Sequence, residues 1–266
     1  MGAMSAIGDS SDSELASVDG RISAADEAVL PLPDPGLFRG DGVFEVMRLY
    51  AGVPFARREH FERMLRSGAL IDLEVDRVAL ERDADALIER IGERDCLLRV
   101  VFTRAGRRVM VSEPMPNHSE PWRLASVLYA PNVILDGVKS ISYAANMHAT
   151  RLAAARGGDE ALLVRADGTV LEAPTSTIFW AGADGALRTP ALDCGILDSI
   201  TRRHLVAELE VEQGSYSLAE LRREAREVFL ASTTREVQAV VAIDEADFEA
   251  AGPATRDAHA AFRTGV

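Results

Sequence analysis

Hydrophobic residues recur along the chain with two different periods. A spacing of three and four residues, as in Phe61, Met64 and Leu65, places apolar side chains on one face of a helix. Short β-branched and apolar runs such as residues 97–103 are typical of buried strands. Helices are expected over residues 58–69, 77–91, 143–156 and 200–212, with a capping-box start at residues 217–220. Strands are expected over residues 18–22, 43–50, 97–103, 124–129, 160–165, 169–172, 177–181, 186–189, 227–231 and 237–243.

Strands and helices are interspersed in this order, so the sequence predicts an α+β (mixed α/β) fold. Residues 1–17 are expected to form a disordered tail, because most of them are Ser, Asp, Gly and other small or polar residues. Ala130-Pro131-Asn132 is the best candidate for a linker. We therefore expect an N-terminal α/β domain over residues 18–129 and a C-terminal domain over residues 130–266.

The composition limits the classes of partner. The chain has 266 residues and a formal net charge of -13, which disfavours non-specific binding of nucleic acid. No apolar run is long enough to span a membrane and the start is polar, so we expect a cytoplasmic protein. Cys96 and Cys194 lie far apart, and neither they nor the histidines have the spacing of metal ligands, so no metal site is expected.

Lys139 follows a short apolar stretch and precedes the helix expected over residues 143–156, so it stands at a strand-to-helix junction. A lysine enclosed in such a place loses its proton easily, because burial disfavours the ammonium form. The free amine is a nucleophile that can form a Schiff base. A lysine at a strand end is more often an exposed surface residue. Whether Lys139 is a surface residue or an enclosed nucleophile must be judged from the other residues that could form a site with it.

Several downstream residues could bind a ligand, although each also has a purely structural interpretation. Glu172 ends a strand, where a carboxylate is either an exposed charge or the partner of a protonated heterocyclic nitrogen. Ser199-Ile200-Thr201 begins a helix whose free N–H groups either bind phosphate or are simply capped. Ser232-Thr233-Thr234 offers hydroxyl groups to the same anion or forms a polar turn. Arg58 opposes the dipole of its helix, which favours a ligand or a salt bridge.

Together these residues resemble the fold-type IV (class IV) pyridoxal-phosphate enzymes, which include branched-chain aminotransferases, D-amino-acid transaminases and aminodeoxychorismate lyases. The resemblance implies a smaller N-terminal α/β domain, a larger C-terminal pseudo-barrel domain, a homodimer and pyridoxal 5'-phosphate as the cofactor. It extends over residues 18–244. The stretches that carry it are residues 40–45, 58–64, 139–143, 159–163, 171–172, 200–202 and 227–230.

The resemblance also implies roles for individual residues. Lys139 would be the Schiff-base lysine and would carry the proton, Glu172 would pair with the pyridine nitrogen, and Tyr143 would lie near the cofactor hydroxyl. The phosphate would be bound by Arg58, by the backbone amides of Ile200 and Thr201, and by the hydroxyl of Thr233. The substrate side would be lined by Arg107, Thr234 and Arg235.

The implied reaction is transfer of an amino group between a small amino acid and a 2-oxo acid. The alternative is a 4-amino-4-deoxychorismate lyase, which releases pyruvate. Lyases similar to this chain carry a threonine where Val46 stands, and a valine cannot donate a proton, so Val46 favours transamination. A non-catalytic relative that binds the cofactor is a further alternative, and the presence of both Lys139 and Glu172 argues against it.

Overall fold

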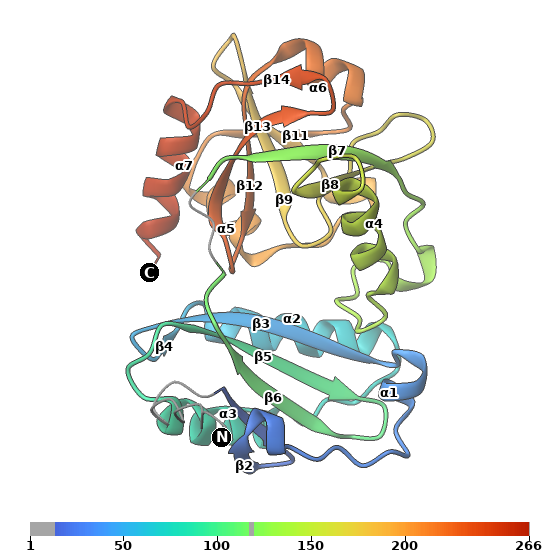
Figure 1. Cartoon of the computed structure of the whole chain (residues 1–266), viewed down its shortest axis with the longest axis vertical. Helices are drawn as coiled ribbons and strands as arrows, with labels where there is room; N and C mark the ends of the chain where they lie inside the picture. The colour runs from blue at the N-terminus through green and yellow to red at the C-terminus, as the bar shows by residue number, and fades with distance from the viewer. Residues whose placement is uncertain (1–13, 117–119, 266) are drawn as a thin grey trace, which may run out of the picture.

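The computed structural model describes residues 14–116 and 120–265, which form two sheets with helices packed against them (Figure 1). The strands of the first sheet are β1 (Leu15–Val18), β2 (Arg21–Ala24), β3 (Gly42–Tyr50), β4 (Val53–Pro54), β5 (Cys96–Thr103) and β6 (Arg108–Glu113). Their order is β2-β1-β6-β5-β3-β4, and all neighbours are antiparallel.

Two helices, α2 (Arg57–Leu70) and α3 (Arg77–Ile91), cover one face of this sheet. The side chains of β3 point alternately to the two faces of the sheet. Val43, Met47 and Leu49 are buried in the core beneath the helices. Phe44 and Val46 therefore point to the opposite face, which is the face toward the second half of the chain. The short helices α1 (Pro35–Arg39) and η1 (Ala25–Glu27) precede β3.

The second sheet has eight strands in the order β11-β10-β9-β12-β13-β7-β8, with β14 paired to β13. Its strands are β7 (Trp122–Leu128), β8 (Glu160–Val164), β9 (Thr177–Gly182), β10 (Leu187–Pro190), β11 (Val211–Gly214), β12 (Ala225–Ser232), β13 (Glu236–Ile243) and β14 (Ala246–Asp247). The accompanying helices are η2 (Val133–Leu135), α4 (Ala144–Ala154), η3 (Leu192–Cys194), α5 (Ile200–Glu208), α6 (Leu218–Glu224) and α7 (Pro253–Arg263).

Both faces of the central strands in this sheet are buried, as their continuous apolar runs require. On β9, Ile178 and Trp180 belong to one core, while Phe179 joins a second core with Leu205 of α5 and Phe262 of α7. Among the described residues, no helix is both long enough and apolar enough to cross a membrane. The expected mixed α/β fold is confirmed.

Residues 169–172 form only isolated bridges, at Thr169 and Val170, in place of the expected strand, and Lys139 follows η2 and a turn where a strand was expected. Three boundaries also differ from the sequence-based expectation. The expected tail reached residue 17, but Leu15–Val18 forms β1 because it pairs with β6; residues 1–13 lie outside the described part. The expected first domain ran to residue 129, but β7 pairs with β8 and β13 and so belongs to the second sheet. The expected helix over residues 200–212 ends at Glu208, because Val211–Gly214 pairs with β10.

A short backbone pairing joins the two halves beside Lys139. Phe44 N–H donates to the carbonyl of Lys139 at 3.0 Å, and Ile141 N–H donates to the carbonyl of Gly42 at 3.1 Å. A side chain at Gly42 would place its Cβ 2.5 Å from the carbonyl oxygen of Phe102, so only glycine fits there. The side chain of Ile141 approaches the same position, at 3.0 Å.

A buried carboxylate also joins the two halves. Glu236, at the start of β13, accepts hydrogen bonds from Arg48 and from the Tyr50 hydroxyl (2.8 Å), both on β3. Arg263 of α7 lies 2.9 Å from the second carboxylate oxygen. Glu236 has φ +57°, a left-handed conformation that a non-glycine residue rarely adopts. The ion pairs therefore hold the turn between β12 and β13 in a conformation that the chain alone disfavours.

We expect Glu236→Ala to lower the free energy of unfolding by about 3 kcal/mol, because it leaves the part-buried Arg48, whose side chain is 15% exposed, without its partner. Urea denaturation of the purified protein measures this. Glu62→Ala is the matched control, since its ion pair with Arg58 is exposed and its removal should cost no more than about 0.5 kcal/mol. If both variants lost the same free energy of unfolding, Glu236 would not have the stabilising role that we assign to it.

Candidate active site

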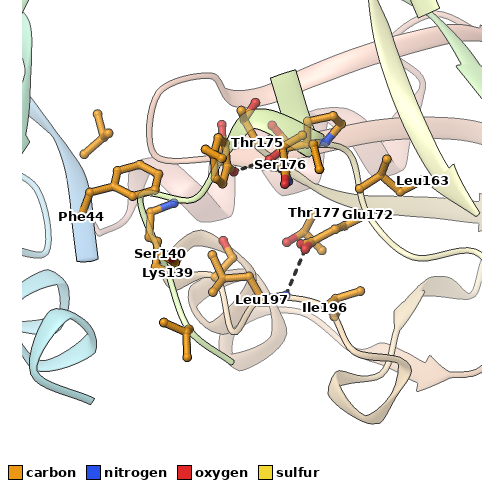
Figure 2. Close-up of a pocket in the computed structure, with 18 of the residues that line it drawn as sticks. Phe44, Lys139, Ser140, Leu163, Glu172, Thr175, Ser176, Thr177, Ile196 and Leu197 are labelled. Carbon is orange, nitrogen blue, oxygen red and sulfur yellow. Dashed lines mark hydrogen bonds between the residues drawn. The ribbon is translucent and has the colours of Figure 1, made fainter. Parts of the chain in front are cut away.

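A cavity of about 560 Å³ lies between the two halves of the molecule, and the amine of Lys139 points into it (Figure 2). The first sheet contributes Phe44, Val46 and Arg99, and α2 contributes Arg63. The remaining walls are the segment around Lys139, the turn at residues 172–177, the residues that precede α5, and the turn between β12 and β13. The cavity thus collects side chains from both halves of the sequence.

Lys139 is held in place by its backbone. Its N–H donates to Ser67 Oγ of α2 at 3.1 Å, and its carbonyl accepts from Phe44. Burial and the neighbouring Arg63 guanidinium lower the pKa of Lys139 to about 8, although Glu45 and Glu172 oppose this shift. The amine therefore reaches its neutral, nucleophilic form near physiological pH.

Glu172 and Thr177 lie together on the other side of the cavity (Figure 2). Burial raises the pKa of Glu172 to about 7, and the backbone N–H of Leu197, which donates to Glu172 Oε1 at 3.1 Å, only partly offsets it. The hydroxyl of Thr177 is buried and has no hydrogen-bond partner in the described part of the chain. A carboxylate without a cationic partner and an unpaired hydroxyl on one wall form a polar surface that is ready for a ligand.

The beginning of α5 forms the opposite end of the site. Ser199 caps the helix, accepting from Arg202 N–H, and the first helical amides belong to Ile200 and Thr201. Ile200 and Thr201 are buried and do not line the cavity. The Thr233 hydroxyl, 3.5 Å from that of Thr201, lines the cavity. Free amides at a helix N-terminus bind anions.

Arg63 is the arginine at this end of the cavity. It makes two hydrogen bonds to Glu45, at 2.7 Å from Nε and 2.6 Å from Nη2, and its Nη1 donates to the carbonyl of Asp198 at 3.2 Å. His60 Nδ1 lies 2.8 Å from the same carboxylate. Burial alone would raise the pKa of Glu45, but Arg63 and His60 outweigh it and lower the pKa to about 2.

Four of the expected site residues do not line the cavity, namely Ile200 and Thr201 at the start of α5 and the two arginines Arg58 and Arg107. Arg58 is on the exposed side of α2, where its side chain is 73% exposed and pairs with Glu59 and Glu62. The dipole argument could not show on which face of the helix this side chain lies. Arg107 pairs with Asp19 at 2.9 Å, at the turn before β6. In this chain neither arginine is positioned to contact a ligand in the cavity.

The other expected residues are brought together. Thr234 and Arg235 line the cavity, and Arg235 donates to Ser176 Oγ at 3.0 Å while its guanidinium lies 4.5 Å from the centre of the Trp122 ring. Tyr143 also lines it, but its hydroxyl donates to the carbonyl of Pro174. Tyr143 therefore holds the turn that follows Glu172, in addition to any contact with a ligand.

Sequence reasoning missed Arg63, Arg99 and Phe44. A usable signal for Arg63 was available, because His60, Arg63 and Ser67 form a polar stripe within the buried face of an amphipathic helix. A simpler signal marked Lys139, which is the only lysine among the 29 Lys and Arg residues of the sequence. Any chemistry that requires an ε-amine must occur at this position.

Comparison with known proteins identifies the family. Residues 42–243 match the family model described as Amino-transferase class IV. The chain belongs to this family. The family expected from the sequence is thus confirmed. Among class IV relatives, the chain is 31% identical to a D-alanine aminotransferase of Listeria monocytogenes serotype 4b, over 85% of this chain and 86% of that protein.

Other relatives of this class IV chain differ in their reactions. It is 29% identical to the aminodeoxychorismate lyase of Bacillus subtilis, over 87% of each protein. The structure of the fold IV-transaminase CpuTA1 from Curtobacterium pusillum superposes with a TM-score of 0.81 and 27% identity, over 94% of this chain and 98% of that one. The family is therefore common to transaminases and a lyase.

We expect Glu172→Gln to remove a pH dependence from the stability of the cofactor-free chain. Because the folded pKa is raised from 4.5 to about 7, Glu172 weakens the folded state as pH rises through this window. Relative to the variant, the wild-type free energy of unfolding should fall by about 3 kcal/mol between pH 4.5 and pH 8. Urea denaturation at both pH values measures this.

Glu45→Gln is the matched comparison with the opposite sign. The folded pKa of Glu45 is lowered, so its contribution is present above pH 4.5 and is lost as pH falls toward 2. At pH 7 this variant should be less stable than the wild type by about 3 kcal/mol. Destabilisation by both substitutions at pH 8 would contradict the assigned environment of Glu172.

Proposed function

We propose that the protein is a pyridoxal-phosphate-dependent class IV aminotransferase, which moves an amino group between a small amino acid and a 2-oxo acid. The observation that carries the proposal is that the only lysine of the sequence lies in the cavity, facing Glu172 (Figure 2). An amine whose pKa is lowered and a carboxylate whose pKa is raised, on opposite walls, match the aldehyde and the ring nitrogen of a pyridine aldehyde.

The residues of the cavity fit pyridoxal 5'-phosphate. The unpaired hydroxyl of Thr177 and the carboxylate of Glu172 provide polar groups at one end. Arg63 and the hydroxyl of Thr233 provide hydrogen-bond donors at the other, and we assign to the same end the first amides of α5, at Ile200 and Thr201. An aromatic phosphate ester with a ring nitrogen needs groups of these kinds at its two ends.

Each of these side chains has a distinct task in the proposed reaction. When bound, pyridoxal phosphate supplies an aldehyde and a ring that accepts electrons. Lys139 Nζ would hold the cofactor through its aldehyde and, once free, would carry a proton from the substrate α-carbon to the cofactor. Glu172, whose pKa burial raises to about 7, would accept a hydrogen bond from the N–H of the protonated ring nitrogen. Tyr143 and Asn146, which both donate to the carbonyl of Pro174, hold the turn beside Glu172.

We assign phosphate binding to Arg63 in place of Arg58. The Nε and Nη2 atoms of Arg63 are bound to Glu45, so the guanidinium is fixed and presents Nη1 toward the start of α5. A fixed guanidinium loses little rotamer entropy when it binds an anion. Arg99 and Arg235, on different walls, are the groups for substrate carboxylates, and Thr234 lies beside Arg235.

Val46 supports transamination over the lyase reaction. Its side chain lines the cavity, next to Arg99 on the neighbouring strand. A valine gives this wall no proton donor, so protonation of a departing fragment would have to come from elsewhere. The similarity to a Bacillus subtilis aminodeoxychorismate lyase keeps the lyase as the second candidate.

The active form that we propose is a cytoplasmic homodimer. Several apolar residues near the cavity are exposed in the single chain, including Phe38 at 68%, Val133 at 86% and Ile134 at 87%. Leu135, beside the last two, lines the cavity itself. A second copy that covers these residues would remove apolar area from water at the entrance of the site.

The test of the reaction is the absorption spectrum of the protein loaded with pyridoxal phosphate, followed during titration with L- and D-amino acids. We expect at least one amino acid to convert the bound cofactor to its pyridoxamine form. Borohydride reduction should fix the cofactor to Lys139 and to no other lysine. Pyruvate release from aminodeoxychorismate without this conversion would assign the lyase, and a spectrum unaltered in Lys139→Ala would exclude both.

The phosphate assignment is tested by comparing two arginine variants. We expect Arg63→Lys to weaken the binding of pyridoxal phosphate by about 10- to 100-fold, because a charge-assisted hydrogen bond is lost. Binding of pyridoxal, which has no phosphate, should change little. Arg58→Ala is the control and should leave both affinities unchanged. If Arg58→Ala weakened the binding of pyridoxal phosphate more than Arg63→Lys does, Arg58 would be the phosphate ligand instead.

A further inference from the structure

Lys139 has a contact in the cavity that the proposed reaction does not explain. Its Nζ lies 4.2 Å from the centre of the Phe44 ring and 5.8 Å from that of Tyr143. An ammonium group within about 6 Å of an aromatic centre is attracted to the negative face of the ring. A neutral amine has no charge for the ring to attract, so this contact distinguishes the two protonation states.

The position of the ring follows from the backbone pairing of the two halves. The N–H of Phe44 donates to the carbonyl of Lys139 at 3.0 Å, so the two residues are direct neighbours where the two halves of the molecule pair. The Phe44 side chain is 6% exposed and packs edge-to-face with Tyr143, at 5.2 Å and 80°. The ring is therefore held beneath the amine and has little freedom to move.

The charged groups around Lys139 are mostly unfavourable to its ammonium form or already paired. Arg63 of α2 and Arg99 of β5 carry the same charge. Glu45 of β3 is bound to Arg63 and His60. Glu172 lies across the cavity, where the N–H of Leu197 holds one of its oxygens. The aromatic rings of Phe44 and Tyr143 thus supply an attraction that the ion pairs do not.

We infer that the face of the Phe44 ring stabilises the protonated amine of Lys139 and so sets how firmly this lysine holds its proton. The role of this interaction in catalysis rests on the proposed function. A lysine that takes a proton from a substrate must keep it until it is passed on, and the ring favours that protonated state. Phe44 is a positioning residue in this scheme, since it acts through Lys139.

The inference can be tested directly because the sequence has one lysine. Protein labelled with [ε-¹³C]lysine gives a single side-chain resonance, whose pH titration in the cofactor-free full-length chain reports the pKa of Lys139. Phe44 is replaced in turn by phenylalanines with one, two and three fluorine atoms, which weaken the ring face while nearly keeping its shape. We expect the pKa to fall stepwise, by about 0.4–1.5 pH units in total.

The control places the trifluorinated residue at Phe102, which is buried on the opposite face of the same sheet. The pKa should then match the wild type. A flat or rising pKa across the series at Phe44 would overturn the inference, as would an equal fall at Phe102. Since no cofactor or substrate is present, this result does not depend on whether the protein proves to be an aminotransferase.

Discussion

The pairing of residues 139–141 with the start of β3 is the interaction on which the site depends. It fixes Lys139 to the first sheet while the amine faces groups supplied by the second. Successive residues of a strand point to opposite faces, so this register sends Glu45 toward α2 and Phe44 toward the cavity. A slip of one residue would exchange the two, placing a carboxylate under the lysine and a ring among the ion pairs.

The electrostatics of the site divide into a satisfied part and an unsatisfied part. Arg63 and His60 both pair with the carboxylate of Glu45, and this lowers the pKa of Glu45. Lys139 and Glu172 are shifted toward their neutral forms by burial. The first group is a rigid support, whereas the pKa values of the second group lie close to physiological pH, so both of its members can change protonation state there. Such sites trade stability for function.

Much of this was accessible from the sequence, because most helices and strands follow the hydrophobic period and because the family resemblance singles out Lys139 and Glu172, although neither lies at the end of a regular strand. The errors share one physical origin, which is that they depend on partners far away in the chain. Strand β7 joined the second sheet because β13 lies beside it. Arg58 and Arg63 are five residues apart, roughly 140° around the helix, so only one of them could reach the cavity. A local charge argument cannot choose between them.

The scarcity of lysine has a consequence for how the protein coexists with its proposed cofactor. A free aldehyde condenses with any accessible ε-amine, and a surface covered in lysines would accumulate stray adducts. Here the positive surface charge is carried by arginine, whose guanidinium stays protonated and is a poor nucleophile. Excess aldehyde thus finds one ε-amine in the sequence, and that amine lies inside the cavity.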